Sequence, residues 1–501
     1  MLPLLTAAQI READAYTIAH KPITSIDLTE RASKVFAEWF INHFPDKAQS
    51  ITVYCGTGNN GGDGLAIARI LNDHEYKFIN IKVARFSDKC SDNFNINLNG
   101  IKQSEIPFYS IEPGGDIPAN ESQVIIDALL GSGLNKPLEG DYKKLVTYIN
   151  SLNKTVIAVD IPTGFFADGE IPTDAIVLKA GHVITFQQPK INFLLPESAP
   201  FIKCWESLTI GIDESFVQSL NSPYQLTEEK DIQKMLKPRH RFSNKGSYGH
   251  ALIIAGQAET MGAALLCSAA SALSGSGLTT ACIPGSGLTA LNSYMPEIMV
   301  IVRTGDEVPE IDWSKFNAIA VGPGLGKQKD ATALLLAILN NYNKPVVFDA
   351  DALNLLADEK NMMSRIPENS IITPHMKEFD RLFGEHNNWW LRMQTGIEMA
   401  KQYKIYILLK NDYTLIITPR GKVHFNSTSN PAMATGGMGD VLTGIITSLL
   451  AQQYSPEEAC IIAAYIHGKA GDELALPNCL NVLMPGLLAA QLPITMVKLM
   501  V

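Results

Sequence analysis

Short apolar runs, nearly continuous and rich in β-branched residues, recur along this chain with helical patterns between them. A strand that is apolar at every position has both of its faces covered, which is typical of parallel sheets in α/β proteins. Many of the runs end in Gly, Asp or Thr, and such sheets bind ligands outside the carboxyl ends of their strands. We therefore predict an α/β fold with sites at strand ends. The runs cover residues 51–55, 124–127, 155–160, 182–186, 251–255, 318–321, 345–349, 370–373 and 405–409.

The length of the chain predicts two domains. A chain of 501 residues is too long for one typical hydrophobic core. The stretch 213–230 is polar and only weakly periodic, and a new series of apolar runs begins after it. We expect one domain over residues 1–218 and a second over residues 219–501, and the two halves show no internal repeat.

Composition and charge exclude several classes of protein. The net charge of −10, without a cluster of Lys and Arg, argues against nucleic-acid binding. No apolar run reaches membrane-spanning length, and the first residues lack the basic start of a secretory signal. The seven cysteines are scattered and form no C-x-x-C pair, so we expect reduced thiols in a cytoplasmic enzyme.

Residues 430–440 read NPAMATGGMGD and stand in front of an apolar helix pattern, which we expect to follow Asp440. Their glycines allow a tight turn that presents bare N–H groups to a phosphate at the start of a helix. Asp440 can take a proton from a nearby hydroxyl, and we expect its carboxylate to be ionised near neutral pH. The segment predicts ATP- or ADP-dependent chemistry on an alcohol; the alternative is a loop that serves only a tight turn.

A second glycine-rich loop, GTGNNGGDG at residues 56–64, is predicted between the run 51–55 and a helical pattern at 65–71. It is not a P-loop, because no Gly-Lys-Ser/Thr follows, and Asn59, Asn60 and Asp63 set it apart from the usual dinucleotide fingerprint. Their amide and carboxylate oxygens suit a hard cation or a hydroxylated ligand.

Two further strand ends are expected at the same crevice. Asp127 precedes the glycine loop ALLGSGL, and Asp160 begins DIPTG, where Pro162 turns the chain. A single aspartate at a strand end is usually a cap. Three strand ends that each carry Asp beside Gly or Thr indicate a functional cluster.

These three motifs resemble those of the NAD(P)H-hydrate epimerase domain, over about residues 5–215. In that family a Rossmann-like domain interconverts the R and S forms of the hydrated nicotinamide ring and binds potassium. The resemblance implies proton transfer by Asp160. It implies potassium ligands at Asn60, Asp127 and Thr163. The residues that it implies for contact with the hydrate are Asn59, Asn60, Gly61, Gly62, Asp63, Gly131, Ser132, Gly133, Leu134, Asn135, Lys136, Pro137 and Asp160.

The second half resembles the ADP/ATP-dependent NAD(P)H-hydrate dehydratases of the ribokinase-like superfamily, from about residue 235 to the end. The resemblance rests on the segment 430–440 together with KGSYG (245–249), GPGLG (322–326), DADALNLL (349–356) and TPHMKEF (373–379). The order of the two halves is similar to that of bifunctional NAD(P)H-hydrate repair enzymes. Such enzymes act on NADH and NADPH hydrates, and we also expect a homo-oligomer.

The second resemblance implies that Asp440 accepts the proton of the ring hydroxyl while that hydroxyl attacks a terminal phosphoryl group; elimination of phosphate then restores the ring. Magnesium is expected with the ADP or ATP. The residues implied for the hydrate are Ala263, Gly326, His375 and Asp440. Those implied for the nucleotide are Lys410, Asn411, Asp412, Tyr413, Thr414, Gly436, Gly437 and Gly439.

Several alternatives stay open at the level of sequence. His375 is either a cap or a ligand contact, and Asp349 and Asp351 either cap strand ends or orient a magnesium-bound water. The chain departs from the family at Met376-Lys377, Ala432 and Met438, and Met438 is expected to alter nucleotide affinity. It also departs at residues 28–33, LTERAS, where the family has Met-Glu-Asn-Ala-Gly. The competing functions are a small-alcohol kinase and, for the N-terminal half, a catalytically silent nucleotide-binding module.

Overall fold

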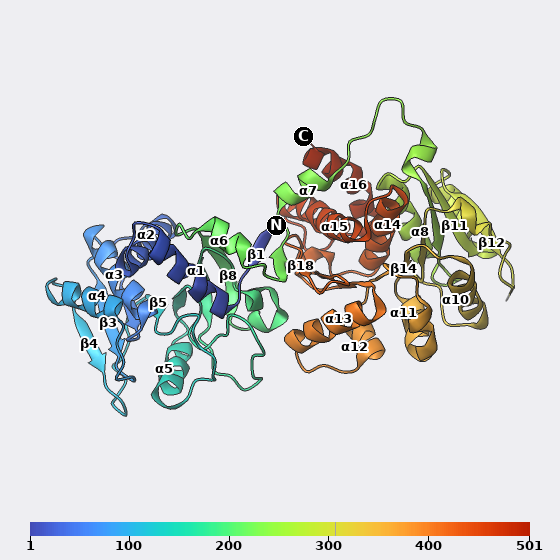
Figure 1. The fold of residues 1–501 in the computed structure, drawn as a ribbon. Coiled ribbons are helices and arrows are strands. Elements are labelled where there is room, and N and C mark those ends of the chain that lie inside the picture. The colour runs from blue at the N-terminus through green and yellow to red at the C-terminus, as the bar shows by residue number, and fades with distance from the viewer. Residues whose placement is uncertain (306, 501) are drawn as a thin grey trace. The chain divides into compact units, whose positions relative to one another are not determined.

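The computed structural model describes residues 1–305 and 307–500, and the chain divides into two compact units (Figure 1). The N-terminal unit comprises Pro3–Ser222 and Asn388–Trp390; the C-terminal unit comprises Met1–Leu2, Pro223–Asn387 and Leu391–Val501. Each unit has a mainly parallel sheet with helices, so the predicted α/β class is confirmed.

Seven parallel strands form the sheet of the N-terminal unit, in the order β4-β3-β2-β5-β6-β7-β8. The strands are β2 (Ile51–Cys55), β3 (Ile79–Ala84), β4 (Phe108–Ile111), β5 (Val124–Ala128), β6 (Thr155–Val159), β7 (Ala180–Phe186) and β8 (Ile202–Leu208). The helices are α1 (Ala7–His20), α2 (Ser25–His43), α3 (Asn59–Asp73), α4 (Asp92–Lys102), α5 (Gly140–Ser151) and α6 (Glu214–Ser219).

Both faces of this sheet are covered. Successive side chains of a strand point to opposite sides, so neighbouring residues pack in different cores. Val53 of β2 packs in one core with Phe36 of α2 and other side chains of α2, α3 and α4. Its neighbour Tyr54 packs in a separate core with Leu145 of α5. Burial on both sides is the physical reason why the central strands β2, β5 and β6 read as nearly continuous apolar runs.

The C-terminal unit is built on an eleven-stranded sheet, in the order β1-β9-β18-β17-β16-β15-β14-β13-β10-β11-β12. Its strands are β1 (Leu2–Leu4), β9 (Tyr224–Leu226), β10 (His250–Ile254), β11 (Leu278–Pro284), β12 (Met299–Arg303), β13 (Ala318–Val321), β14 (Val346–Phe348), β15 (Ile371–Ile372), β16 (Tyr406–Leu409), β17 (Leu415–Ile417) and β18 (Val423–Phe425). Neighbouring strands are parallel along the row β16-β15-β14-β13-β10-β11-β12. The strand β17 is antiparallel to both of its neighbours, β16 and β18.

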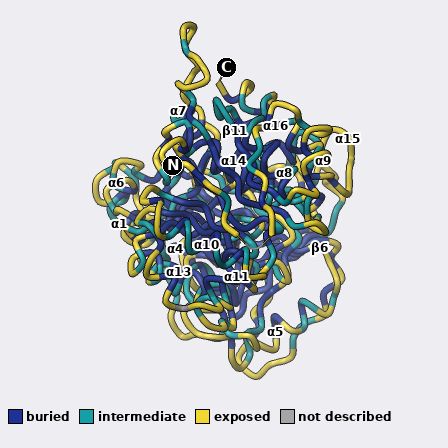
Figure 2. Tube along the Cα trace, turned by 90° about the vertical axis from the view of Figure 1, so that its right-hand side faces the viewer, coloured by how far each residue is buried: buried dark blue, intermediate teal, exposed yellow. Residues whose placement is uncertain are grey.

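Ten helices belong to the described part of this unit, with α15 and α16 on one side of its strands and α12 and α13 on the other (Figure 1). The helix α14 is almost wholly buried, as its dark trace in Figure 2 shows. The helices are α7 (Glu229–Met235), α8 (Met261–Leu273), α9 (Leu288–Tyr294), α10 (Lys329–Asn341), α11 (Asp351–Asp358), α12 (Met376–Phe383), α13 (Trp389–Tyr403), α14 (Met438–Ala451), α15 (Pro456–Asn478) and α16 (Pro485–Met500).

The predicted boundaries of the two glycine-rich loops are wrong in part. The loop expected at 56–64 becomes helix at Asn59, and the helix expected after Asp440 already begins at Met438. Apolar periodicity marks only the buried part of a helix, whereas the first turn follows from backbone hydrogen bonding. The stretch 213–230 is also more regular than its polar sequence indicates, because it contains α6 and β9 and the start of α7.

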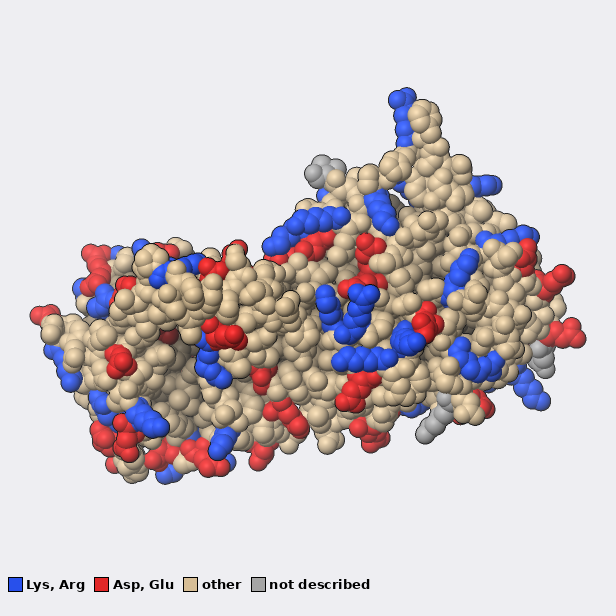
Figure 3. Space-filling view, in the orientation of Figure 1, with Lys and Arg blue, Asp and Glu red and all other residues tan. Residues whose placement is uncertain are grey.

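The distribution of charged side chains on the surface agrees with the lack of a Lys and Arg cluster in the sequence. Basic and acidic side chains are interspersed on the face shown in Figure 3. Among residues 1–305 and 307–500, no helix is long and apolar enough to cross a membrane.

Candidate functional site

The first candidate site lies at the start of α3, directly after β2. Gly58 is the extended N-cap of this helix, and Asn59 and Asn60 are its first residues. The helix packs closely on the strand end: a Cβ added at Gly61 would lie 1.9 Å from the carbonyl oxygen of Gly56, so no larger residue fits. The free N–H groups of the first turn therefore open at the carboxyl end of the sheet.

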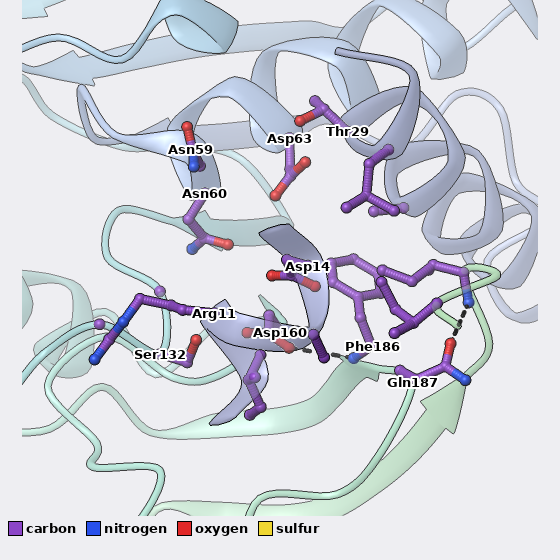
Figure 4. A pocket seen from close by; sticks show the side chains of 18 of the residues that line it. Arg11, Asp14, Thr29, Asn59, Asn60, Asp63, Ser132, Asp160, Phe186 and Gln187 are labelled. Atoms are coloured by element: carbon purple, nitrogen blue, oxygen red, sulfur yellow. Dashed lines mark hydrogen bonds between the residues drawn. The ribbon is translucent and has the colours of Figure 1, made fainter. Parts of the chain in front are cut away.

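A cavity of about 490 Å³ opens beside this helix start and is lined by α1, α2 and α3 and by several strand ends (Figure 4). The structure brings eight of the predicted hydrate contacts into its wall, while Gly61 and Gly62 are buried within α3 and residues 135–137 lie outside the lining. The eight are Asn59, Asn60, Asp63, Gly131, Ser132, Gly133, Leu134 and Asp160.

Asp160 follows β6 in an unusual backbone conformation, with φ +65°. Its Oδ1 accepts hydrogen bonds from Nζ of Lys190 at 2.7 Å and from the Thr185 hydroxyl and the Phe186 N–H at 3.2 Å each. Lys190 is 1% exposed. A non-glycine residue in the left-handed region is strained, and here three donors hold the carboxylate in place.

Two further carboxylates, Asp14 and Asp63, line the same cavity. Burial, together with the charge of Asp160, raises the pKa of Asp14 to about 6, although Lys190 acts in the opposite direction. Burial and the charges of Asp160 and Asp14 raise the pKa of Asp63 well above its usual value, while a hydrogen bond from Thr29 opposes the shift. The cavity therefore holds acidic groups that bind protons near neutral pH.

Two of the three predicted potassium ligands, Asp127 and Thr163, bind each other. The Thr163 hydroxyl and N–H donate to Asp127 at 2.7 and 2.8 Å, and the Leu129 N–H donates at 3.2 Å. Burial raises the pKa of Asp127 to about 6, against these hydrogen bonds. Asn60 lines the cavity with a buried side-chain nitrogen that has no partner in the described structure.

The second candidate site lies at the start of α14. Gly437 is the N-cap, with φ +99°, and a Cβ there would lie 2.7 Å from Cδ1 of Leu266, so this turn requires glycine. Asp440 occupies the first turn of the helix instead of preceding it. The free N–H groups of this turn and the positive end of the helix dipole lie beside the carboxylate.

An ion pair between the partly buried Lys410 and the buried Asp349 lies next to Asp440. Nζ of Lys410 is 3.0 Å from Oδ1 of Asp349, and the Thr443 hydroxyl donates to Oδ2 of Asp349 at 2.7 Å. Glu378 lies 4.0 Å from the same ammonium. Burial alone would lower the pKa of Lys410, but the charges of Asp349 and Glu378 outweigh it and raise that pKa.

The expectation that Asp440 is fully ionised near neutral pH is wrong. Burial and the charge of Asp349 raise its pKa to about 7, and Lys410 compensates only in part. The helix start favours the ionised form, yet its effect is smaller than the loss of solvation and the repulsion between two carboxylates. Asp440 thus gains and loses its proton close to neutral pH.

The remaining predicted residues are arranged around this centre. Nδ1 of His375 accepts from the N–H groups of Lys377 and Glu378, which makes His375 the N-cap of α12 and leaves its ring half exposed. The Gly326 N–H donates to Asp351 at 2.8 Å. The Gly324 backbone approaches Ala263 so closely that an added Cβ would lie 3.0 Å from it. Residues 410–414 form the turn between β16 and β17.

Sequence reasoning missed several residues of both sites. Asp14 and Lys190 reach the N-terminal cavity from segments outside the recognised motifs. Glu378 lies within the motif TPHMKEF and Thr443 follows the segment 430–440, but the sequence assigned no role to either residue. The charged residue Lys190 stands in QQPKINF, where apolar neighbours hinted at its burial. Asp14 carries no such signal, because polar and apolar residues are mixed along α1 without a clear apolar face.

Comparison with known proteins agrees with the division of the chain. Residues 25–192 match the family model described as YjeF-related protein N-terminus, and residues 251–493 match the NAD(P)H-hydrate dehydratase family. A hypothetical protein from Streptococcus mutans, of known crystal structure, is 26% identical with a TM-score of 0.50, covering 55% of this chain and 100% of its own.

Full-length relatives join both halves. The bifunctional NAD(P)H-hydrate repair enzyme Nnr of Coxiella burnetii is 34% identical over 95% of each chain. The enzyme of the same name from Escherichia coli is 31% identical over 90% of this chain and 86% of its own. With two matching domains in the same order and full-length identity at this level, the chain belongs to the family of bifunctional NAD(P)H-hydrate repair enzymes.

Proposed function

We propose that this chain repairs hydrated NADH and NADPH in two steps, with one step in each unit. Residues 1–218 interconvert the R and S hydrates, and the ribokinase-like residues 219–501 dehydrate the S hydrate with ADP or ATP. Family membership supports the pair of activities. The observation that carries the proposal is the carboxylate of Asp440, with a pKa near neutrality, in the first turn of a helix that starts at a glycine N-cap.

Dehydration begins with transfer of a phosphoryl group to the hydroxyl on C6 of the ring. Asp440 accepts the hydroxyl proton as the oxygen attacks the terminal phosphorus. A new P–O bond forms, and the bond from that phosphorus to its bridging oxygen breaks, which leaves ADP from ATP or AMP from ADP. Phosphate then departs from C6 with the electron pair of the C–O bond while C5 loses a proton, and the dihydronicotinamide is restored.

The backbone around Asp440 provides the electrostatic part of this step. The free N–H groups at Gly437, Met438 and Gly439 bind the charge that develops on the phosphoryl oxygens. We assign nucleotide contacts to these glycines, to Gly436 and to the turn 410–414, and hydrate contacts to Ala263, Gly326 and His375. The ammonium of Lys410 adds positive charge beside the helix start.

Magnesium fits this site as a companion of the nucleotide. In residues 1–305 and 307–500, no three His, Cys, Asp or Glu side chains are grouped to hold a metal directly. Magnesium usually keeps several waters and binds through phosphates with one or two carboxylates. Asp351 and Asp440 are the carboxylates that would orient such waters, and the ion would neutralise charge on the phosphates.

Epimerisation is assigned to the cavity around Asp160, whose size is that of a small-molecule site. Asp160 would exchange a proton with the hydrate, and the lining residues Asn59, Asn60, Asp63 and 131–134 would hold the ring. The donor set of Asn60, Asp127 and Thr163 consists of hard oxygens, which suits potassium. Replacing potassium with sodium is expected to slow R-to-S exchange while dehydration of the S hydrate continues.

The proposal is tested with a mixture of R and S NADH hydrates and either nucleotide. Complete recovery of the dihydronicotinamide absorbance, with one phosphate released for each molecule restored, is the expected result. Phosphate transfer to a small alcohol without recovery of absorbance would instead establish a small-alcohol kinase. Recovery of only the S fraction would show that the N-terminal unit is catalytically silent.

A further inference from the structure

Three carboxylates and one buried ammonium converge on the N-terminal cavity from separate parts of the chain. Asp63 comes from α3, Asp160 from the end of β6, and Asp14 from α1, and Figure 4 shows all three side chains in the same cavity. Lys190 binds Asp160. The sequence motifs account for Asp63 and Asp160, but they assign no task to Asp14.

The helix α1 is fixed so that Asp14 faces the cavity. Its N-cap Thr6 forms a capping box with Gln9, and Tyr16 stacks on Phe216 of α6 with ring centroids 3.9 Å apart. The Asp213 N–H donates to the buried hydroxyl of Thr17 at 3.0 Å. Ile10, Ala13, Asp14 and Ile18 therefore share one helix face that lines the cavity, and Glu12 is exposed to solvent.

Asp14 differs from the other two carboxylates in how it can exchange a proton. Burial together with the charges of Asp160 and Asp14 raises the pKa of Asp63 well above its usual value. Asp160 is bound by Lys190. Burial and the charge of Asp160 raise the pKa of Asp14 to about 6, so this carboxyl can exchange a proton near neutral pH.

We propose that Asp14 is a second catalytic residue of the epimerase site, which exchanges a proton with the hydrate on one face of its ring while Asp160 does so on the other. This assignment rests on the proposed epimerase function. It gives the cavity two proton-transfer groups, one that protonates the departing hydroxyl and one that accepts the proton of the incoming water.

The chemical step balances without a further reagent. The protonated carboxyl of Asp14 gives its proton to the C6 hydroxyl, the C6–O bond breaks with its electron pair on oxygen, and water leaves. The lone pair of the ring nitrogen forms a double bond to C6. A water molecule then attacks C6 from the opposite face, its oxygen forms the new C–O bond, the second electron pair of the C6–N double bond returns to the ring nitrogen, and Asp160 accepts the released proton. In the reverse direction the two aspartates exchange roles.

The test uses the full chain and the R hydrate in water labelled with ¹⁸O, without nucleotide. Wild-type protein is expected to form S hydrate and to incorporate one solvent oxygen per inversion. Asp14→Asn is expected to slow both events together by about 100-fold or more, the usual effect of losing an acid–base group. Asp14→Glu should keep measurable exchange, and Glu12→Gln on the solvent side of the same helix should match the wild type.

A merely structural role of Asp14 is separated by two readouts. Dehydration of purified S hydrate by the C-terminal unit should be unchanged in Asp14→Asn, which reports that the chain is folded. The wild-type exchange rate should follow a bell over pH, because only the singly protonated pair is competent, and Asp14→Glu should displace the limb that belongs to this residue.

The outcomes distinguish this assignment from the proposed function itself. If the wild type shows no exchange between R and S, the epimerase function is wrong. If the wild type exchanges and Asp14→Asn keeps its rate and its pH profile, the role of Asp14 is wrong while the function stands. Inversion by the wild type without entry of solvent oxygen would overturn the proposed C–O cleavage.

Discussion

Both units place a lysine against an aspartate at the carboxyl end of a parallel sheet, but they connect that pair to the reacting group differently. In the N-terminal unit Lys190 binds Asp160, the proposed proton-transfer residue, at 2.7 Å. In the C-terminal unit Lys410 binds Asp349 at 3.0 Å, and Asp440 is a separate carboxylate. In the N-terminal site the lysine–aspartate pair contains the proposed proton-transfer residue, whereas in the C-terminal site the pair only lies beside it.

The difference shows how the pKa of a catalytic base can be brought close to neutral pH. Burial raises the pKa of Asp440, the charge of Asp349 raises it further, and Lys410 offsets only part of the shift. The Thr443 hydroxyl fixes the second oxygen of Asp349, so its charge is held at a constant position. Because Asp440 is not itself part of the ion pair, it can take up the proton that the hydroxyl loses when a phosphoryl group is transferred to it.

The largest effect is expected from Asp440→Asn. The amide cannot accept the hydroxyl proton, so dehydration of the S hydrate should fall by about 10²- to 10⁴-fold. Exchange between R and S should be unaffected, because Asp440 belongs to the other unit. Single-hydrate assays with ADP and ATP measure both rates, and substantial dehydration by the variant would contradict the role assigned to Asp440.

The next largest effect is expected in the pH dependence of dehydration, which tests the raised pKa of Asp440. Only ionised Asp440 accepts a proton, and its pKa is raised to about 7. The value of kcat/KM for dehydration should therefore fall about tenfold for each pH unit below that point. Measurements on the free enzyme between pH 5 and 9 test this, with total nucleotide and magnesium held constant, and a profile that is flat through pH 7 would rule out this base.

Two glycines at the start of α14 give a matched pair of smaller effects. In Gly437→Ala the new Cβ lies 2.7 Å from Leu266 at φ +99°, and the strain should cost roughly 1–3 kcal/mol in the free energy of unfolding. In Gly439→Ala the nearest atom is Nζ of Lys410 at 3.3 Å, the mobile end of a side chain, so the cost should be smaller. Urea unfolding of both variants provides the comparison; equal stability would show that the turn is not strained.

The smallest effect concerns stability against pH. A folded-state pKa above the unfolded value means that Asp440 favours folding at low pH and loses this contribution as pH rises through about 7. Asp440→Asn should therefore have a higher Tm than the wild type at pH 8, by ~2–4 °C for each kcal/mol. The gap should narrow as the pH falls to 5 and close only below the unfolded pKa of about 3.9. A constant gap between the two pH values would contradict the raised pKa.

Much of the fold is readable from the sequence because buried parallel strands are apolar on both faces. The runs at 51–55 and 318–321 coincide with β2 and β13, and most of the other predicted runs end within a residue or two of a strand. β3 escapes this criterion because it contains the buried Lys82, whose Nζ donates to the carbonyls of Pro118 and Ala119. A charged residue whose partners lie in a distant loop leaves no local pattern.

The sites are predictable where the backbone determines them and not where distant side chains meet. Gly437 and Gly61 mark real close approaches, so their motifs locate both helix starts. The contacts of Lys190 with Asp160 and of Lys410 with Asp349 join residues 30 and 61 positions apart. The pKa of Asp440 depends first on burial and then on the charge of Asp349, and neither can be read from its position at a helix start.

The central claim is that one chain carries two separate sites that act in sequence on the same molecule. The most direct measurement mixes the Asp160→Asn and Asp440→Asn proteins in equal amounts with R hydrate and ADP, and follows dihydronicotinamide absorbance. Neither variant alone should restore NADH from the R hydrate faster than the uncatalysed exchange allows, whereas the mixture should restore it, because the S hydrate formed by one variant is dehydrated by the other. Failure of the mixture, with each variant active in its remaining step, would contradict the account.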